Sequence, residues 1–213
     1  MGFSLLNGDK FSKALGMGAI GLGIGAAAGS LAGGLGNGIM ASRDGREFWN
    51  GARLIKEEVI ADRNLPPTQS DGAYNCGPAM GEAITGIPQG EYRSALGGNP
   101  NTDPVMTNEM NDAIEHLSGR RVFPYRRPKG ELGAINLAER MNRGEDFYVV
   151  SGTGTSVSHA SGLNSISLKT YLRVSGSTYV KPIYQIMDPA IGGYRPMGAQ
   201  SMKNIYRIIP LSK

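Results

Sequence analysis

Apolar residues recur at helical spacing in two stretches near the middle of the chain. The first series follows Thr107 and the second precedes Arg143; their members are Met110, Ala113, Ile114 and Leu117, then Leu132, Ile135, Ala138 and Met141. Steps of three and four residues place such side chains along one face of a helix. The pattern predicts one helix capped by Thr107 and a second helix closed by Arg143 and Gly144.

Strand patterns dominate the later part of the chain. Runs rich in β-branched and aromatic residues occupy residues 147–150, 166–174, 179–187 and 204–210. A turn at Ser175-Gly176-Ser177 separates the second run from the third. Residues 86–103 are rich in Gly, Asn and Pro and predict a long loop. Because helical patterns come first and strand patterns afterwards, we expect an α+β domain with an antiparallel sheet.

The N-terminal part has a different composition. From Ala14 to Ser42 there are 29 residues without a charge, and ten of them are glycine. Glycine disfavours helices in water, but a repeat of small residues every fourth position lets helices approach closely in lipid. We interpret residues 1–42 as a glycine-rich uncharged segment, either a linker or a membrane-associating element. A basic n-region and a clean cleavage site are missing, so we do not expect a signal peptide.

Residues 43–64 are interpreted as a connecting helix. It would run roughly from Phe48 to Ala61 and cover the following domain with Trp49, Leu54 and Ile55. The dipeptide Pro66-Pro67 breaks the pattern and marks a domain entry. The remaining residues, 65–213, are expected to form the catalytic domain.

The chain contains one cysteine, Cys76, and two histidines, His116 and His159. A single cysteine excludes an internal disulfide and suits a reducing compartment. With two histidines and no paired cysteines, we expect neither a metal ion nor another cofactor. His116 falls off the apolar face of its predicted helix, so we expect it to be exposed and non-catalytic.

Cys76 stands where a short helix is expected to begin. Asn75 is a good N-cap residue, and Pro78 suits a first turn because its missing N–H would be unpaired there anyway. The apolar face of this helix would consist of Ala79, Met80, Ala83 and Ile84. A helix N-terminus beside an imidazole favours the thiolate, which is the reactive form of cysteine. These features predict a nucleophile at Cys76.

Three further residues stand in a useful order around Cys76. His159 would accept the thiol proton and later donate it to the leaving group, and Asp188 would hold the imidazole in the useful tautomer. Gln69 could donate its amide to a developing oxyanion, together with the backbone N–H of Cys76. A lone Cys or His is more often structural, but the combination favours catalysis.

These segments resemble the papain-like cysteine peptidase superfamily, most closely bacteriocin-processing peptidases and the papain-fold toxin domains of bacterial polymorphic toxins. The resemblance covers about residues 65–210 and lies in Gln69, Asn75-Cys76-Gly77-Pro78-Ala79, Ser158-His159-Ala160 and Ile186-Met187-Asp188-Pro189. It implies a papain-like fold, with Cys76 on a helix N-terminus and both His159 and Asp188 on an antiparallel sheet. It also implies Gln69 as the oxyanion residue, although Gln69 stands seven residues before Cys76 where six is common.

The resemblance implies a hydrolase that acts on amide bonds of a protein, as a peptidase or a glutamine deamidase. Both reactions pass through the same tetrahedral oxyanion, so the motif does not separate them. The segment Phe48-Trp49-Asn50-Gly51-Ala52 after a glycine-rich tract resembles the junction between the repeat shell of Rhs-type toxins and their C-terminal toxin. This implies a secreted or delivered effector that acts in the target-cell cytoplasm, with a protein substrate there and a cognate immunity protein.

Other functions stay open at this point. A non-enzymatic membrane-active or adaptor protein could work through residues 14–42, and a processing peptidase could trim a secreted leader. The basic segment Arg120–Lys129 carries aromatic residues between its charges, as nucleic-acid-binding segments do. We favour a solvated loop or hairpin there, because the formal net charge of +4 is mild, and we do not expect nucleic acid as a partner.

Overall fold

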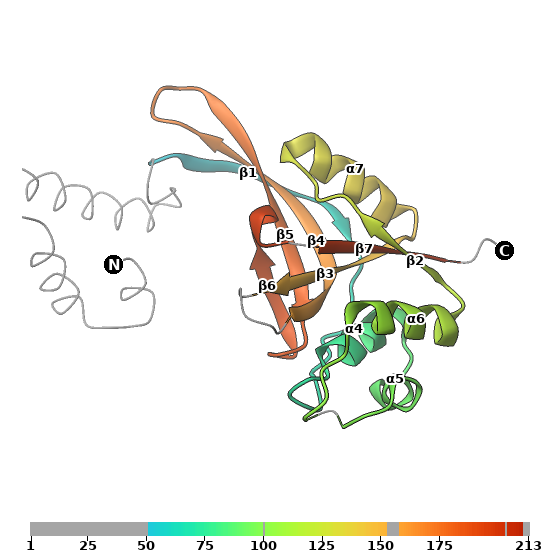
Figure 1. Ribbon diagram of the computed structural model, residues 1–213. Coiled ribbons are helices and arrows are strands. Elements are labelled where there is room, and N and C mark those ends of the chain that lie inside the picture. Colours follow the sequence, from blue (N-terminus) through green and yellow to red (C-terminus); the bar gives the residue numbers. More distant parts are fainter. Residues whose placement is uncertain (1–50, 100, 153–157, 203, 211–213) are drawn as a thin grey trace, which may run out of the picture. The chain divides into compact units, whose positions relative to one another are not determined.

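A computed structural model of the protein describes residues 51–99, 101–152, 158–202 and 204–210 (Figure 1). The elements in chain order are β1 (Arg53–Asp62), α4 (Cys76–Thr85), α5 (Gln89–Leu96), α6 (Thr107–Ser118), β2 (Arg121–Tyr125), α7 (Gly130–Asn142), β3 (Asp146–Gly152), β4 (Ser158–Leu172), β5 (Thr178–Asp188), β6 (Gly193–Met197), a short 3-10 helix (Ala199–Ser201) and β7 (Asn204–Ile209). Helices and an antiparallel sheet occur together, as the α+β prediction requires.

The chain divides into two compact units. Of the described residues, 51–55 and 171–179 form the smaller unit. The larger unit consists of the described residues between 56 and 170 and from 180 onward. Within the smaller unit the rings of Tyr171 and Tyr179 stack with centroids 5.3 Å apart, and the Arg173 guanidinium lies 4.8 Å above the Tyr179 ring. Every candidate site residue belongs to the larger unit.

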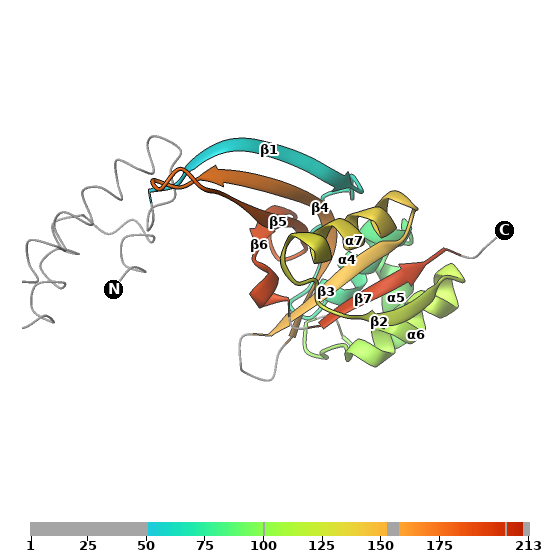
Figure 2. The same ribbon diagram turned by 90° about the horizontal axis from the view of Figure 1, so that it is seen from above.

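The sheet has seven strands in the order β2-β7-β3-β4-β5-β6, and β1 pairs with β4 outside this path. Figure 2 shows β2, β7, β3 and β4 running side by side. The antiparallel register sets Ser151 of β3 opposite His159 of β4, and Asp188 of β5 opposite Gly193 of β6. His159, at the start of β4, and Asp188, at the end of β5, therefore stand on neighbouring strands of the sheet.

Strand β3 is buried on both faces, which explains its unbroken apolar run. Phe147 and Val149 belong to a hydrophobic cluster with α7, whereas Tyr148 and Val150 belong to a second cluster with α4, α5 and α6. Successive strand residues point to opposite faces, so β3 contributes to both cores at once. Figure 1 shows the corresponding layers, with α7 over one face of the sheet and the three other helices over the opposite face.

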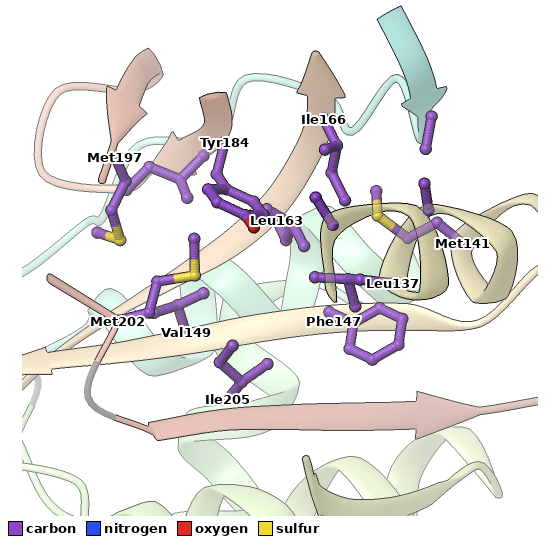
Figure 3. Packing of buried hydrophobic residues seen from close by; sticks show 14 residues of the cluster. Leu137, Met141, Phe147, Val149, Leu163, Ile166, Tyr184, Met197, Met202 and Ile205 are labelled. Carbon is purple, nitrogen blue, oxygen red and sulfur yellow. The ribbon is translucent and has the colours of Figure 1, made fainter. Parts of the chain in front are cut away.

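Figure 3 shows the core between α7 and the sheet. Leu137 and Met141 of the helix belong to one buried cluster with side chains from five strands or their connections, among them Phe147, Val149, Leu163, Ile166, Tyr184, Met197, Met202 and Ile205. The helix buries Ala138 and Met141 of the stripe that its sequence predicts, whereas Ile135 is only half-buried. Leu132 belongs to the predicted stripe but is 70% exposed, because the buried face of α7 is formed by Ala134, Leu137, Ala138 and Met141.

Two predictions for the first part of the domain are wrong. Residues 53–62 of the predicted connecting helix form strand β1 instead; they include the β-branched Ile55, Val59 and Ile60, which favour a strand, and β1 pairs with β4. The rest of that prediction, residues 43–52, lies mostly outside the described residues. The predicted loop 86–103 contains helix α5, which is anchored by one fully buried side chain, Tyr92.

The other helices begin and end close to where the sequence predicts. Helix α6 starts at Thr107, so the cap position falls on Met106, whose backbone N–H donates to the Glu109 carboxylate over 2.9 Å. In the described ranges no helix is long and apolar enough to cross a membrane. The predicted linker or membrane-associating element, residues 1–42, lies outside those ranges.

Packing between α4, α5 and α6 leaves no room for a side chain at Gly81. A Cβ there would lie 2.8 Å from the end of Met110 and 2.9 Å from the ring of Tyr92. Gly81→Ala should therefore lower the free energy of unfolding by about 1–2 kcal/mol, because overpacking outweighs the gain in helix propensity. Gly90→Ala, in α5 with open space around it, should be neutral or stabilise by up to about 1 kcal/mol. Urea unfolding measures both, and equal effects would contradict this packing.

Candidate functional site

Cys76 is the first residue of α4, and the segment before it is held by an unusual set of contacts. Asn75 occupies the N-cap position but makes no capping bond with its side chain. Its fully buried amide instead donates to Gln89 over 3.0 Å and to Asp71, and it accepts a hydrogen bond from Arg93 Nε. The predicted capping role of Asn75 is wrong in this respect, and the consequence is an open helix N-terminus at the thiol.

Arg93 ties this segment to a second loop. Its terminal nitrogen donates to the Tyr74 carbonyl over 2.8 Å, and both terminal nitrogens lie 3.3 Å from the Asp103 carbonyl. One guanidinium thus contacts the residues before Cys76 and the loop that leads into α6. The planar group with its fixed donors suits such a bridging position better than a lysine would.

His159 lies at the start of β4 and links the other two residues of the predicted triad. Its Nε2 is 2.6 Å from Asp188 Oδ1, so Nδ1 is the ring nitrogen left for the Cys76 thiol. A hydrogen bond between His159 and Cys76 is the main influence on the pKa of the imidazole. The structure therefore brings Cys76, His159 and Asp188 together in the order that nucleophilic catalysis requires.

Asp188 ends β5 and is almost fully buried. Its Oδ1 accepts the His159 bond and also the backbone N–H of Ala190 over 3.0 Å, and its Oδ2 is paired with Arg195 Nε. Burial raises the pKa of this carboxyl, but the bonds from Arg195, Ala190 and His159 outweigh burial and hold the pKa below its usual range. Asp188 is therefore an anion at neutral pH.

The thiol and the imidazole shift each other toward the charged forms. Burial raises the pKa of Cys76, yet the hydrogen bond from His159, the backbone N–H of Ala160 and the positive charge of His159 bring it below the usual thiol value. The pKa of His159 is raised, first by the bond to Cys76 and then by Asp188, against the opposing effect of burial. In the thiolate–imidazolium form, such a pair is a nucleophile with an acid beside it.

Two hollows open on the pair, and Ala73, Cys76 and His159 line both. The first has a volume of about 220 Å³ and an apolar wall that includes Val105, Met106, Met110, Tyr148 and Val150. The second, of about 240 Å³, is lined by Ser70, Gly72, Pro189 and Ala190. The thiol and the imidazole are therefore reached from two sides, one of them bordered by apolar side chains.

Gln69 occupies a different position from the other three predicted residues. It is exposed, its backbone carbonyl accepts a bond from Gln89 over 2.9 Å, and it does not line either of the two hollows. Gly192 lies against it, with a positive φ of 59°, and a Cβ on Gly192 would come within 2.9 Å of Gln69 Cβ. The role of Gln69 as oxyanion donor stays a prediction.

The remaining candidates take up structural or exposed positions. His116 is exposed in the last turn of α6. In the basic segment, Arg120 pairs with the buried Asp146, which also contacts Arg63 at 2.6 Å, and Arg121 lies over the Phe123 ring. Within the described ranges no three His, Cys, Asp or Glu side chains gather as metal ligands would.

Sequence reasoning missed two residues of this site, Arg93 and Arg195. Neither belongs to a motif, and each acts through a contact between two elements of the fold. Compared with known proteins, the chain matches no family model and no curated protein. The interpretation of the site therefore depends on its own geometry and on the resemblance of its motifs.

The pKa shifts predict how thiol reactivity depends on pH. Cys76 is the only cysteine of the chain, so alkylation by iodoacetamide reports on this thiol alone. Reactivity in the native protein should persist below the pH at which an ordinary thiol, with a pKa of about 8.5, loses it. In His159→Ala the profile should move to higher pH, because burial remains while the strongest opposing bond is lost.

The matched control for this measurement is His116→Ala, which removes the other histidine from an exposed position. It should leave the alkylation profile where the wild type has it. A His159→Ala profile that coincides with the wild-type profile would show that the imidazole does not act on the thiol.

Proposed function

We propose that the protein is a cysteine hydrolase with a papain-like fold that acts on amide bonds of a target protein. The observation that carries the proposal is the contact series from Cys76 through His159 to the buried Asp188. Each residue stands on a different element, α4, β4 and β5, so the arrangement is a tertiary one. A structural cysteine would need no such partners, because a buried thiol behaves as a small apolar group.

The proposed reaction has two steps. The Cys76 thiolate attacks the carbonyl carbon of the amide, and the imidazolium of His159 donates its proton to the leaving nitrogen, which departs as an amine or as ammonia. The resulting thioester is then attacked by water, whose proton passes to His159, and the acid leaves with regeneration of the thiol. Asp188 stays ionised throughout and holds the ring in place.

The oxyanion of both steps needs donors near the thiol. The start of α4 supplies backbone N–H groups that no side chain caps, and the N–H of Gly77 already lowers the pKa of Cys76. A helix N-terminus also favours negative charge through its dipole. The resemblance implies Gln69 as the second donor, although Gln69 lines neither hollow in the structure.

The substrate is a peptide bond or a glutamine side chain of a protein. The resemblance to papain-fold toxin domains supports a role as a secreted or delivered effector that acts in the target-cell cytoplasm, and it supports a cognate immunity protein as the second partner. The segment Phe48-Trp49-Asn50-Gly51-Ala52 agrees with this assignment.

Expression in the cytoplasm of a sensitive cell tests the proposal. Wild type should kill, and Cys76→Ala should abolish killing because removal of a single member of such a triad costs about 10⁴-fold or more in rate. His159→Ala should have the same effect, and His116→Ala should kill as the wild type does. The readout is the number of surviving colonies, with expression and folding of each variant verified.

Proteomics of the poisoned cells then separates the two reactions. New peptide termini indicate a peptidase, and a mass increase of about one dalton at glutamine indicates a deamidase, because an amide becomes an acid. Killing by a folded Cys76→Ala variant would sink the hydrolase proposal and direct attention to residues 14–42.

A further inference from the structure

We propose that Arg195 is a positioning residue of this site: its guanidinium holds Asp188 as an anion turned toward His159. The inference rests on the proposed cysteine chemistry, since it concerns the same three residues. Arg195 lies on β6, an element that sequence reasoning did not connect with catalysis. It does not contact the thiol, so its effect must pass through Asp188.

The strand register explains why this arginine reaches the carboxylate. Asp188 stands opposite Gly193, and Ile186 stands opposite Arg195. Residues two positions apart on a strand share a face, so Arg195 is the diagonal neighbour of Asp188, within reach of a long side chain. The position directly opposite Asp188 is glycine, which places no side chain between the two groups.

The hydrogen bonds of Asp188 divide between its two oxygens. Oδ1 accepts the bonds from His159 Nε2 at 2.6 Å and from the backbone N–H of Ala190 at 3.0 Å. Oδ2 is paired with Arg195 Nε. A carboxylate held at both oxygens cannot rotate away from the imidazole without breaking a charged contact. Arg195 therefore fixes the orientation of Asp188 as well as its charge.

Because the Asp188 carboxylate is buried, it needs positively charged partners such as Arg195 to stay ionised. The Asp188 side chain is 5% exposed, whereas that of Arg195 is 41% exposed. A buried carboxylate without sufficient positive partners takes up a proton rather than remain charged. The charged groups on Asp188 are His159 of β4 and Arg195 of β6, and His159 in turn faces Cys76 of α4.

The sign of the effect follows from these contacts. Without Arg195, burial is opposed by fewer bonds, so Asp188 should bind a proton at a higher pH than in the native protein. Without its Oδ2 partner the carboxylate can also turn away from Nε2, and a carboxyl that is turned away or protonated stabilises the imidazolium less, so the pKa of His159 falls. The thiolate then loses its charged partner, and the pKa of Cys76 rises. Loss of Arg195 should therefore shift thiol reactivity toward higher pH.

Alkylation of the purified full-length protein by iodoacetamide across a pH series tests this. Arg195→Gln should move the acid limb of the profile upward by about one pH unit, since a weakened charge-assisted hydrogen bond to the imidazolium corresponds to roughly one pKa unit. Arg195→Lys keeps the positive charge, so its profile should lie close to that of the wild type. If the glutamine variant does not fold, Arg195→Thr, whose branched side chain suits a strand, provides the same comparison.

Two controls separate positioning from a general effect on the sheet. Arg121→Gln removes an exposed strand arginine that stacks on Phe123, and its profile should equal that of the wild type. In an Asp188→Asn background, Arg195→Gln should add no further shift, because the carboxylate through which Arg195 acts on His159 and the thiol is already absent.

The outcomes distinguish this inference from the proposed function. A folded Arg195→Gln variant with the wild-type profile overturns the positioning role and leaves the hydrolase proposal standing. An equal shift in the Asp188→Asn background also overturns it. A shift that depends on Asp188, in a protein that neither kills nor hydrolyses a target, supports the role of Arg195 and counts against the hydrolase. An ordinary thiol profile in the wild type overturns both.

Discussion

The organisation of the site depends on one buried carboxylate. Asp188 could not remain charged in its position without the bonds from His159, Ala190 and Arg195, which come from β4, from the turn after β5 and from β6. Because an uncompensated buried charge is costly, these elements are held in a common arrangement. The imidazole orientation, and through it the state of the thiol, follows from this requirement.

Much of the fold was predictable where burial is one-sided or complete over several residues. The helical spacing of Met110, Ala113 and Ile114 predicted α6, and the run from Phe147 to Val150 predicted β3. Such periodicities can be seen in the sequence because the residues of each pattern pack on a single buried surface. The grouping of Cys76, His159 and Asp188 was also predictable, because their chemistry restricts which residue types can stand together. The papain-like topology itself stays a proposal.

The remainder could not be predicted because it depends on contacts between different elements of the fold. Helix α5 buries Tyr92 as its single anchor, so the surrounding polar sequence resembles a loop. Strand β1 is mostly exposed and owes its conformation to its pairing with β4. Asn75 is a residue type that often caps helices, yet Gln89 and Arg93 bind its amide. Arg195 becomes relevant only through the register of β5 and β6.

The bridge made by Arg93 has a mechanical consequence. The same guanidinium holds Asn75 and the Tyr74 carbonyl, immediately before the nucleophile, and the Asp103 carbonyl, immediately before the wall of the apolar hollow. The wall and the start of α4 therefore share one anchor. Because Arg93 contacts both segments, it ties the loop that carries Val105 to the residues immediately before Cys76.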